Sequence, residues 1–347
     1  MPVNADKPHL WKADVGQSVD GYDEWFTRLA PQAYRDARAQ TAERVEQALQ
    51  ATSNLLSITP EALRQHPEIL STLRMVTSPP IARETLIGIA HVSAPLVTAM
   101  ERDGHIPPGM LDAIVDADLW RIGALLSEMA DRDIFPWLDG ANKYQLSGIQ
   151  IQRAATIVAD RLSLSVADTI IRDAHKARQV ATVRTWLARH GYAQAETTRR
   201  LGFDKMEPGT FVLGITLPVL QAGRSTGSTI PIDVALMPKH ARPNETPLLL
   251  EAKAAGDYTR ANKRRADEAA KVAELRGNYG EGVRVVQFLS GYFDSGYLGS
   301  MAAEGIDWVW EHRVDDLAQI DGVTLTPLEQ KQAARQAASG APTPLTR

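Results

Sequence analysis

The spacing of apolar residues changes once along the chain, close to Tyr192. Between about residues 22 and 192, apolar side chains recur every three or four positions with charged residues between them, which is typical of amphipathic helices. Beyond that point apolar residues form short runs or alternate with polar ones, which is typical of strands. The pattern predicts a helical N-terminal half followed by a region that mixes strands with helices.

Five apolar segments in the second region are predicted strands, separated by connections rich in Gly, Ser, Pro and Asn. A basic amphipathic helix over about 259–276 follows the third of them. The expected fold class is α/β (α+β), with a central mixed five-stranded sheet flanked by helices. We expect a helical domain over 1–175, the sheet-bearing core over 176–320, and a C-terminal helix with a disordered tail over 321–347. The predicted strands are 210–220, 230–237, 247–253, 283–291 and 306–313.

Composition restricts the kinds of site that the chain can build. The 347 residues include no cysteine, which excludes disulfides and thiolate metal sites and fits a reducing compartment such as the cytoplasm. The N-terminal residues contain no apolar signal segment, and no apolar run reaches the roughly 18 residues that a membrane span requires. We therefore expect a soluble cytoplasmic protein without a membrane partner.

Charge is unevenly distributed. The whole chain has a formal net charge of −4, but residues 172–276 carry 18 Lys and Arg against 11 Asp and Glu, a balance of +7. A local positive field is what a phosphate backbone requires, whatever the overall sign. A solvated basic helix face is the alternative explanation.

Two of the predicted strands carry charge where burial favours apolar residues. If 230–237 and 247–253 pair as an antiparallel hairpin, Asp233 falls opposite Glu251, with Cβ atoms ~5 Å apart. Lys253 then shares a face with Glu251 because strands repeat every two residues. Close carboxylates repel unless a cation lies between them, and Mg²⁺ accepts carboxylates together with phosphate oxygens. The alternative is structural: a strand-end aspartate and an edge salt bridge.

The motif Pro231-Ile232-Asp233 followed by Glu251-Ala252-Lys253 resembles the PD-(D/E)xK nuclease fold, although Ile232 separates the proline from the aspartate. Residues 205–318 resemble, more closely, the type II restriction endonucleases of the XamI family. The resemblance implies that Asp233, Glu251 and the Ala252 carbonyl bind Mg²⁺, and that Lys253 is the catalytic lysine beside the two acids.

The same resemblance implies the reaction and the partners. It implies cleavage of both strands of double-stranded DNA at a short palindromic site, leaving 5′-phosphate and 3′-hydroxyl ends. The family's namesake site, GTCGAC, is the first target to test. A homodimer is expected because a palindrome requires two sites related by a two-fold axis. A methyltransferase that protects the host genome is expected as a functional partner.

Further residues are candidates for supporting roles. Many members of this fold use another acid, for which Glu196 is the first candidate and Glu207 the second; each is otherwise an ordinary surface glutamate. The basic helix and the stretch SGYFDSGYLGS (290–300) are candidate DNA contacts, against a solvated helix start and a structural turn with half-buried tyrosines. The predicted DNA-binding residues are Arg260, Asn262, Lys263, Arg264, Arg265, Tyr292 and Tyr297.

Two other functions stay open at this point. A repair or recombination nuclease of the same fold would use the same acids and lysine on nicks, mismatches or junctions. A non-catalytic DNA-binding module would have no reason to place two carboxylates near a phosphate. The sequence contains no phosphate-binding G-x-x-x-x-G-K-[ST] motif and no zinc-ligand spacing, which argues against an ATP-driven or zinc enzyme.

Overall fold

The computed structural model describes residues 2–139, 147–195, 206–220, 228–242, 245–256 and 258–324, and gives only the backbone of 258–266. The chain divides into two compact units, Arg28–Ile171 and a second that joins Met1–Thr27 to Arg172–Arg347. The predicted domain boundary after residue 175 differs from this division mainly at the N-terminus, because the first 27 residues belong with the sheet. The predicted helix and tail beyond residue 324 lie outside the described residues.

The unit Arg28–Ile171 is helical, as predicted. Its helices begin where the sequence provides caps: the Thr59 side chain accepts a hydrogen bond from the Ala62 backbone N–H, and Ser93 does the same for Leu96. Large apolar side chains such as Phe135 and Trp137 fill its core. The elements are the C-terminal part of α1 (Pro8–Ala51), α2 (Pro60–Gln65), η1 (Pro67–Ile69), α3 (Leu70–Leu73), η2 (Arg74–Val76), α4 (Arg83–Ala90), α5 (Ala94–Asp103), α6 (Asp112–Glu128), η3 (Pro136–Leu138) and the first part of α7 (Gly148–Arg189).

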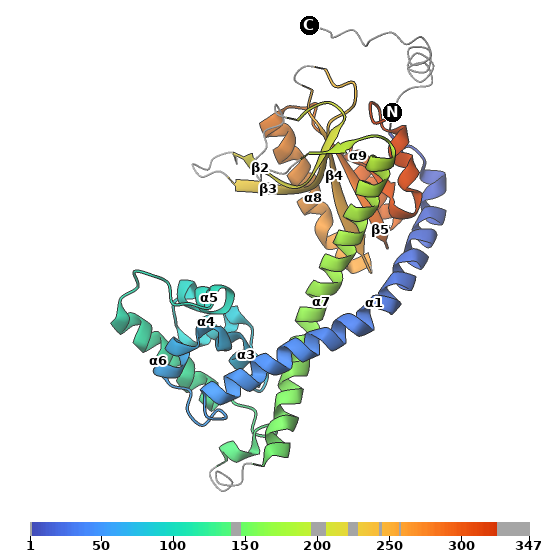
Figure 1. The fold of residues 1–347 in the computed structure, drawn as a ribbon. Helices are drawn as coiled ribbons and strands as arrows, with labels where there is room; N and C mark the ends of the chain where they lie inside the picture. The colour runs from blue at the N-terminus through green and yellow to red at the C-terminus, as the bar shows by residue number, and fades with distance from the viewer. Residues whose placement is uncertain are drawn as a thin grey trace, which may run out of the picture. The chain divides into compact units, whose positions relative to one another are not determined.

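The other unit is built on one mixed sheet (Figure 1), whose strands follow the order β1-β2-β3-β4-β5-β6. The sheet has six strands and not the predicted five, because β1 has only two residues and is too short to produce an alternating pattern. The pairs β2–β3 and β3–β4 are antiparallel, whereas β1–β2, β4–β5 and β5–β6 are parallel. The strands are β1 (Ala193–Gln194), β2 (Thr210–Val219), β3 (Ser228–Leu236), β4 (Leu248–Ala255), β5 (Arg284–Gly291) and β6 (Asp307–Trp310).

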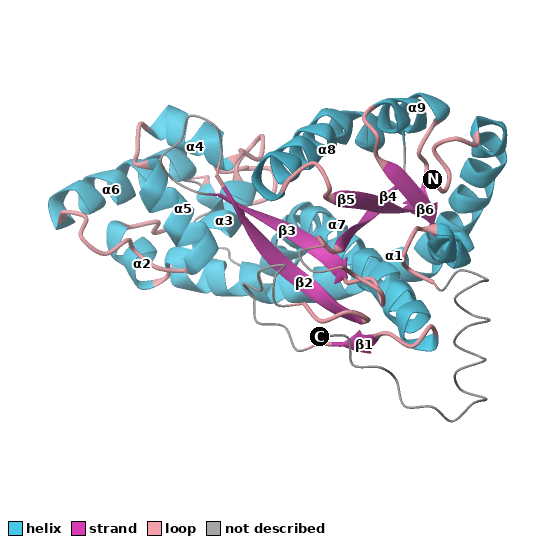
Figure 2. Cartoon of the chain, turned by 90° about the horizontal axis from the view of Figure 1, so that it is seen from above, coloured by secondary structure: helices cyan, strands magenta, loops and turns pink. Residues whose placement is uncertain are grey.

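Helices cover both faces of this sheet. The parallel pairs β4–β5 and β5–β6 are connected by α8 (Tyr258–Tyr279) and α9 (Ser295–Ala303), and these helices lie on one face while α7 lies on the other (Figure 2). The predicted strand 306–313 ends at Trp310 and continues as the 3₁₀ helix η5 (Glu311–Gln319). Among the described helices, none combines the length and apolar character that crossing a bilayer requires.

The alternation of β3 residues between the two faces shifts by one position at Asp233. Val234 lies in the core on the α7 side, whereas Ile232 lies in the core on the α8 side. In β2 the residue between the partners of these two is Gly214, which has a φ of 64°. Such a left-handed residue is accessible to glycine at little cost. The shift leaves Asp233 between the two apolar cores, which is why a carboxylate is tolerated in the middle of a strand.

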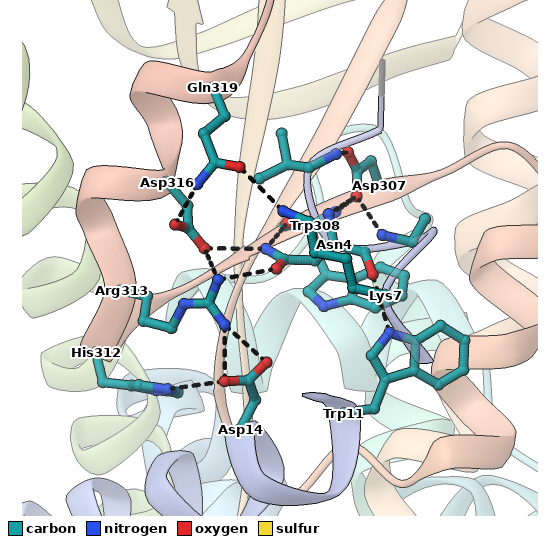
Figure 3. A network of polar contacts seen from close by, with 12 residues as sticks. Asn4, Lys7, Trp11, Asp14, Asp307, Trp308, His312, Arg313, Asp316 and Gln319 are labelled. Atoms are coloured by element: carbon teal, nitrogen blue, oxygen red, sulfur yellow. Dashed lines mark hydrogen bonds and ion pairs between the residues drawn. The ribbon is translucent and has the colours of Figure 1, made fainter. Parts of the chain in front are cut away.

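The N-terminal segment is attached to the sheet by polar contacts (Figure 3). The Asn4 side chain donates a hydrogen bond to the Trp308 carbonyl at 2.9 Å, and the Asn4 backbone N–H donates to Asp307 at 3.0 Å. In η5, Arg313 Nη1 donates to both carboxylate oxygens of Asp14 of α1, at 2.8 and 2.9 Å. These contacts with β6 and η5 explain why the first residues of the chain belong to the sheet unit.

Candidate active site

The two predicted metal-binding acids lie on neighbouring, paired strands. Val234 pairs with Leu250 and Leu236 with Leu248, so the antiparallel hairpin predicted from the sequence is present. The pairing ends at Val234 and Leu250, one residue before Asp233 and one residue before Glu251 is reached.

Asp233 has one backbone partner and one charged partner. Its Oδ2 accepts a hydrogen bond from the Ala252 backbone N–H at 2.9 Å, and its Oδ1 lies 2.6 Å from Lys176 Nζ of α7. The Asp233 side chain is largely buried, whereas 52% of the Lys176 side chain is exposed. The carboxylate thus faces away from the apolar cores, toward a cation at the protein surface.

Glu251 is buried and held by two lysines. Its Oε2 lies 2.9 Å from Lys253 Nζ, and its Oε1 forms an ion pair with Lys271 of α8. Lys271 also donates a hydrogen bond to the Pro231 carbonyl of β3 at 2.9 Å. Burial alone would raise the pKa of Glu251, but the two ammonium groups outweigh it and leave the pKa below its usual value. Glu251 is therefore a carboxylate at neutral pH.

Lys253 lies between two carboxylates. Its Nζ is 2.9 Å from Glu251 and 2.5 Å from Glu268 Oε1 of α8. Burial alone would lower the pKa of Lys253, but these two acids raise it well above the ordinary lysine value. The side chain is an ammonium ion at neutral pH, suited to stabilising negative charge on a phosphate.

The helices α7 and α8 thus supply three charged residues that the sequence analysis missed. Glu268 and Lys271 are spaced at helical intervals with the buried Val272 and Leu275, so a helical projection of 259–276 would have placed them on its apolar face. Charged residues on such a face were a usable signal. Lys176 carried no comparable signal, because half of its side chain is exposed. Asp233 pairs with Lys176 of α7, whereas Glu251, Lys253, Glu268 and Lys271 form one connected set of ion pairs on the α8 side.

The structure places neither of the two sequence candidates for an additional acid at the site. Glu196 lies outside the described residues. Glu207 is exposed in the turn before β2, where its backbone carbonyl accepts a hydrogen bond from the Thr210 hydroxyl at 2.6 Å. The second carboxylate beside Lys253 is Glu268, which comes from the helix after the motif.

The donor set of Asp233 and Glu251 fits a hard divalent cation. Both are carboxylates on neighbouring strands, and the Ala252 carbonyl lies on the backbone beside Glu251. In the structure each carboxylate is balanced by an ammonium group. Within the part of the chain that the structure describes, no group of three or more His, Asp or Glu side chains is arranged to hold a metal ion. A cation here would take its remaining ligands from water and phosphate oxygens, as Mg²⁺ usually does.

The predicted DNA contacts fall into three situations. The basic residues lie on α8, a helix as predicted, but in the stretch whose side chains are not described: Arg260, Asn262, Lys263, Arg264 and Arg265. Tyr292 is half-buried after β5. Tyr297 is only 1% exposed, and its hydroxyl donates a hydrogen bond to Gln287 at 3.1 Å. A ring so deeply buried offers DNA no surface, so Tyr297 fits the alternative of a structural turn.

Comparisons with known proteins find restriction endonucleases. A family model for the XamI restriction endonucleases matches residues 53–310. The type II restriction enzyme SalI of Streptomyces albus G is 45% identical over 321 residues, which cover 91% of this chain and 98% of that enzyme. No solved structure matches the chain. Restriction endonucleases generally use a divalent metal ion. The chain belongs to the XamI family of restriction endonucleases and is a type II site-specific deoxyribonuclease.

Proposed function

We propose that this enzyme hydrolyses both strands of a short palindromic DNA site, using Mg²⁺ and leaving 5′-phosphate and 3′-hydroxyl ends. The observation that carries the proposal is that Asp233 accepts a hydrogen bond from the backbone N–H of Ala252, the residue between Glu251 and Lys253, while the Lys253 ammonium lies 2.9 Å from Glu251. The balance of +7 over residues 172–276 supports an anionic substrate.

In the proposed site, Asp233, Glu251 and the Ala252 carbonyl hold the metal ion. Bound Mg²⁺ supplies Lewis-acid polarisation of the scissile phosphate. Lys253 orients the attacking water and stabilises the negative charge that develops on the phosphate oxygens, a role suited to its permanent ammonium. The Ala252 N–H orients Asp233, so the dipeptide Glu251-Ala252 carries one acid and orients the other.

The DNA target and the assembly extend the same proposal. We take GTCGAC as the first target to test, a choice that the 45% identity to a type II restriction enzyme supports. A homodimer provides two active sites for the two strands of a palindrome. A cytoplasmic DNA methyltransferase of the same specificity protects the host genome.

Digestion of phage DNA tests the proposal. Purified enzyme is incubated with Mg²⁺ beside Glu251→Ala, and fragment ends are sequenced. Discrete fragments from the wild type alone, ending at one palindrome, are the expected result. A smear favours a repair or recombination nuclease, and tight duplex binding without any cleavage favours a non-catalytic module. Light scattering of the protein in solution tests the dimer.

A further inference from the structure

A chain of buried polar contacts leads from α9 to the lysine of the site. The Tyr297 hydroxyl donates a hydrogen bond to Gln287 Oε1 at 3.1 Å, and Gln287 Nε2 donates to Glu268 Oε2 at 3.5 Å. The other oxygen of Glu268, Oε1, lies 2.5 Å from Lys253 Nζ. Tyr297, Gln287 and Glu268 are 1%, 2% and 7% exposed.

These residues occupy places where apolar side chains would stabilise the fold more simply. Burying a polar group costs free energy unless it is hydrogen-bonded, and burying a carboxylate costs more. Gln287 lies in β5 directly beside Glu251 of β4, in the parallel register of the two strands. Each of these polar groups forms a hydrogen bond or ion pair with the next, and the series ends at Lys253.

We propose that Glu268 is a positioning residue for Lys253, and that Gln287 and Tyr297 hold Glu268 in place. The inference rests on the proposed function, in which Lys253 acts on the phosphate. A lysine ammonium on a flexible four-carbon stem needs fixed partners to occupy one position. Glu251 is a proposed metal ligand and also pairs with Lys271, whereas Glu268 is outside the proposed metal ligands and pairs with Lys253.

The direction of the hydrogen bonds gives Tyr297 a definite part in this arrangement. A glutamine amide has a donor end and an acceptor end. The Tyr297 hydroxyl donates to the acceptor end, which turns the donor end toward Glu268. Without that hydroxyl the amide is free to turn its oxygen toward the carboxylate, and Glu268 then loses the hydrogen bond from Gln287.

Single-turnover cleavage of a duplex that the wild type cuts tests the proposal, with Glu268→Gln and Tyr297→Phe as variants. The matched control is Tyr192→Phe, since Tyr192 is also buried and its hydroxyl donates one hydrogen bond to the Val323 carbonyl at 2.6 Å in the core on the α7 side. Duplex Kd is measured with Ca²⁺ in place of Mg²⁺, and the melting temperature of each variant is recorded.

The expected cleavage rates fall about 10- to 100-fold for Glu268→Gln and about 3- to 10-fold for Tyr297→Phe, the size of effect that misplacement of a reacting group produces. Kd stays within about twofold, and Tyr192→Phe cleaves like the wild type despite a similar loss of stability. Adding Tyr297→Phe to Glu268→Gln causes no further loss, because both act through one carboxylate.

Two results would overturn the inference while leaving the proposed function intact. One is cleavage by Glu268→Gln and Tyr297→Phe within about twofold of the wild type. The other is an equal loss of rate in Tyr192→Phe, which would show that lost stability alone slows the reaction. A wild type that cuts no DNA overturns the inference together with the proposed function.

Discussion

Lys176 of α7 forms an ion pair with Asp233 of β3, with 2.6 Å between Nζ and Oδ1. The two residues are far apart in the sequence, and the lysine comes from a helix that packs on the sheet. The pair places an exposed cation on a carboxylate that we propose as a metal ligand. Metal binding at Asp233 therefore competes with Lys176.

We predict that Lys176→Gln raises the affinity of the free protein for a divalent ion. Removing an ammonium that neutralises one ligand should strengthen binding by up to about fivefold, since an ion pair with an exposed partner contributes up to about 1 kcal/mol. Titration calorimetry with Mn²⁺ and no DNA measures this change. Arg172→Gln is the control, because Arg172 is also exposed on α7 but pairs with Asp173 at 3.7 Å. Equal affinities for Lys176→Gln and the wild type would contradict the competition.

The junction of β4 and β5 near the site requires glycine at residue 291. Gly291 has a φ of 94°, and a Cβ built there would lie 2.0 Å from the Ala255 carbonyl oxygen. The next backbone N–H, of Tyr292, donates to that same oxygen at 2.7 Å. Gly291→Ala should therefore destabilise the protein by roughly 1–3 kcal/mol.

Thermal unfolding compares this substitution with Gly282→Ala. A Cβ at Gly282, in the turn before β5, meets no atom within 4 Å. We expect a clear decrease in melting temperature for Gly291→Ala and little change for Gly282→Ala. Equal melting temperatures would show that the strand ends separate without cost.

Glu311 links stability to pH on the α7 side of the sheet. Burial alone would raise its pKa, but hydrogen bonds with His175 and Ser290 and the charge of Arg178 hold it below its ordinary value of 4.5. A carboxyl whose pKa is lower in the folded state stabilises the fold above its unfolded pKa, and that contribution is lost as pH falls through the folded pKa.

Glu311→Gln should therefore destabilise the protein at pH 7, and the difference from the wild type should shrink as pH falls below about 4.5. Denaturant unfolding of both proteins from pH 7 to pH 3.5 measures the difference. A difference that stays constant over this range would mean that the charge of Glu311 contributes nothing.

Local sequence patterns predicted the strands and the hairpin that carries the two acids, because the two-residue repeat of strands leaves little choice of register. The residues that complete the site come from helix packing. Glu268 and Lys271 were visible only as charges on an apolar helix face, and Lys176 reaches Asp233 through the packing of α7 on the sheet. The hydrogen bond from Asn4 to Trp308 joins residues 304 positions apart in the sequence, so no local pattern could predict it.

The central claim is that Lys253 acts on the DNA phosphate beside Asp233 and Glu251. Its most direct test is single-turnover cleavage of a GTCGAC duplex with Mg²⁺ by the wild type, Lys253→Ala and Lys239→Ala. Lys239 is the matched control. Its Nζ donates a hydrogen bond to the His190 carbonyl at 2.6 Å, away from the acids of the site. We predict equal rates for the wild type and Lys239→Ala, and a rate at least about 100-fold lower for Lys253→Ala. Cleavage by Lys253→Ala at the wild-type rate would contradict the account.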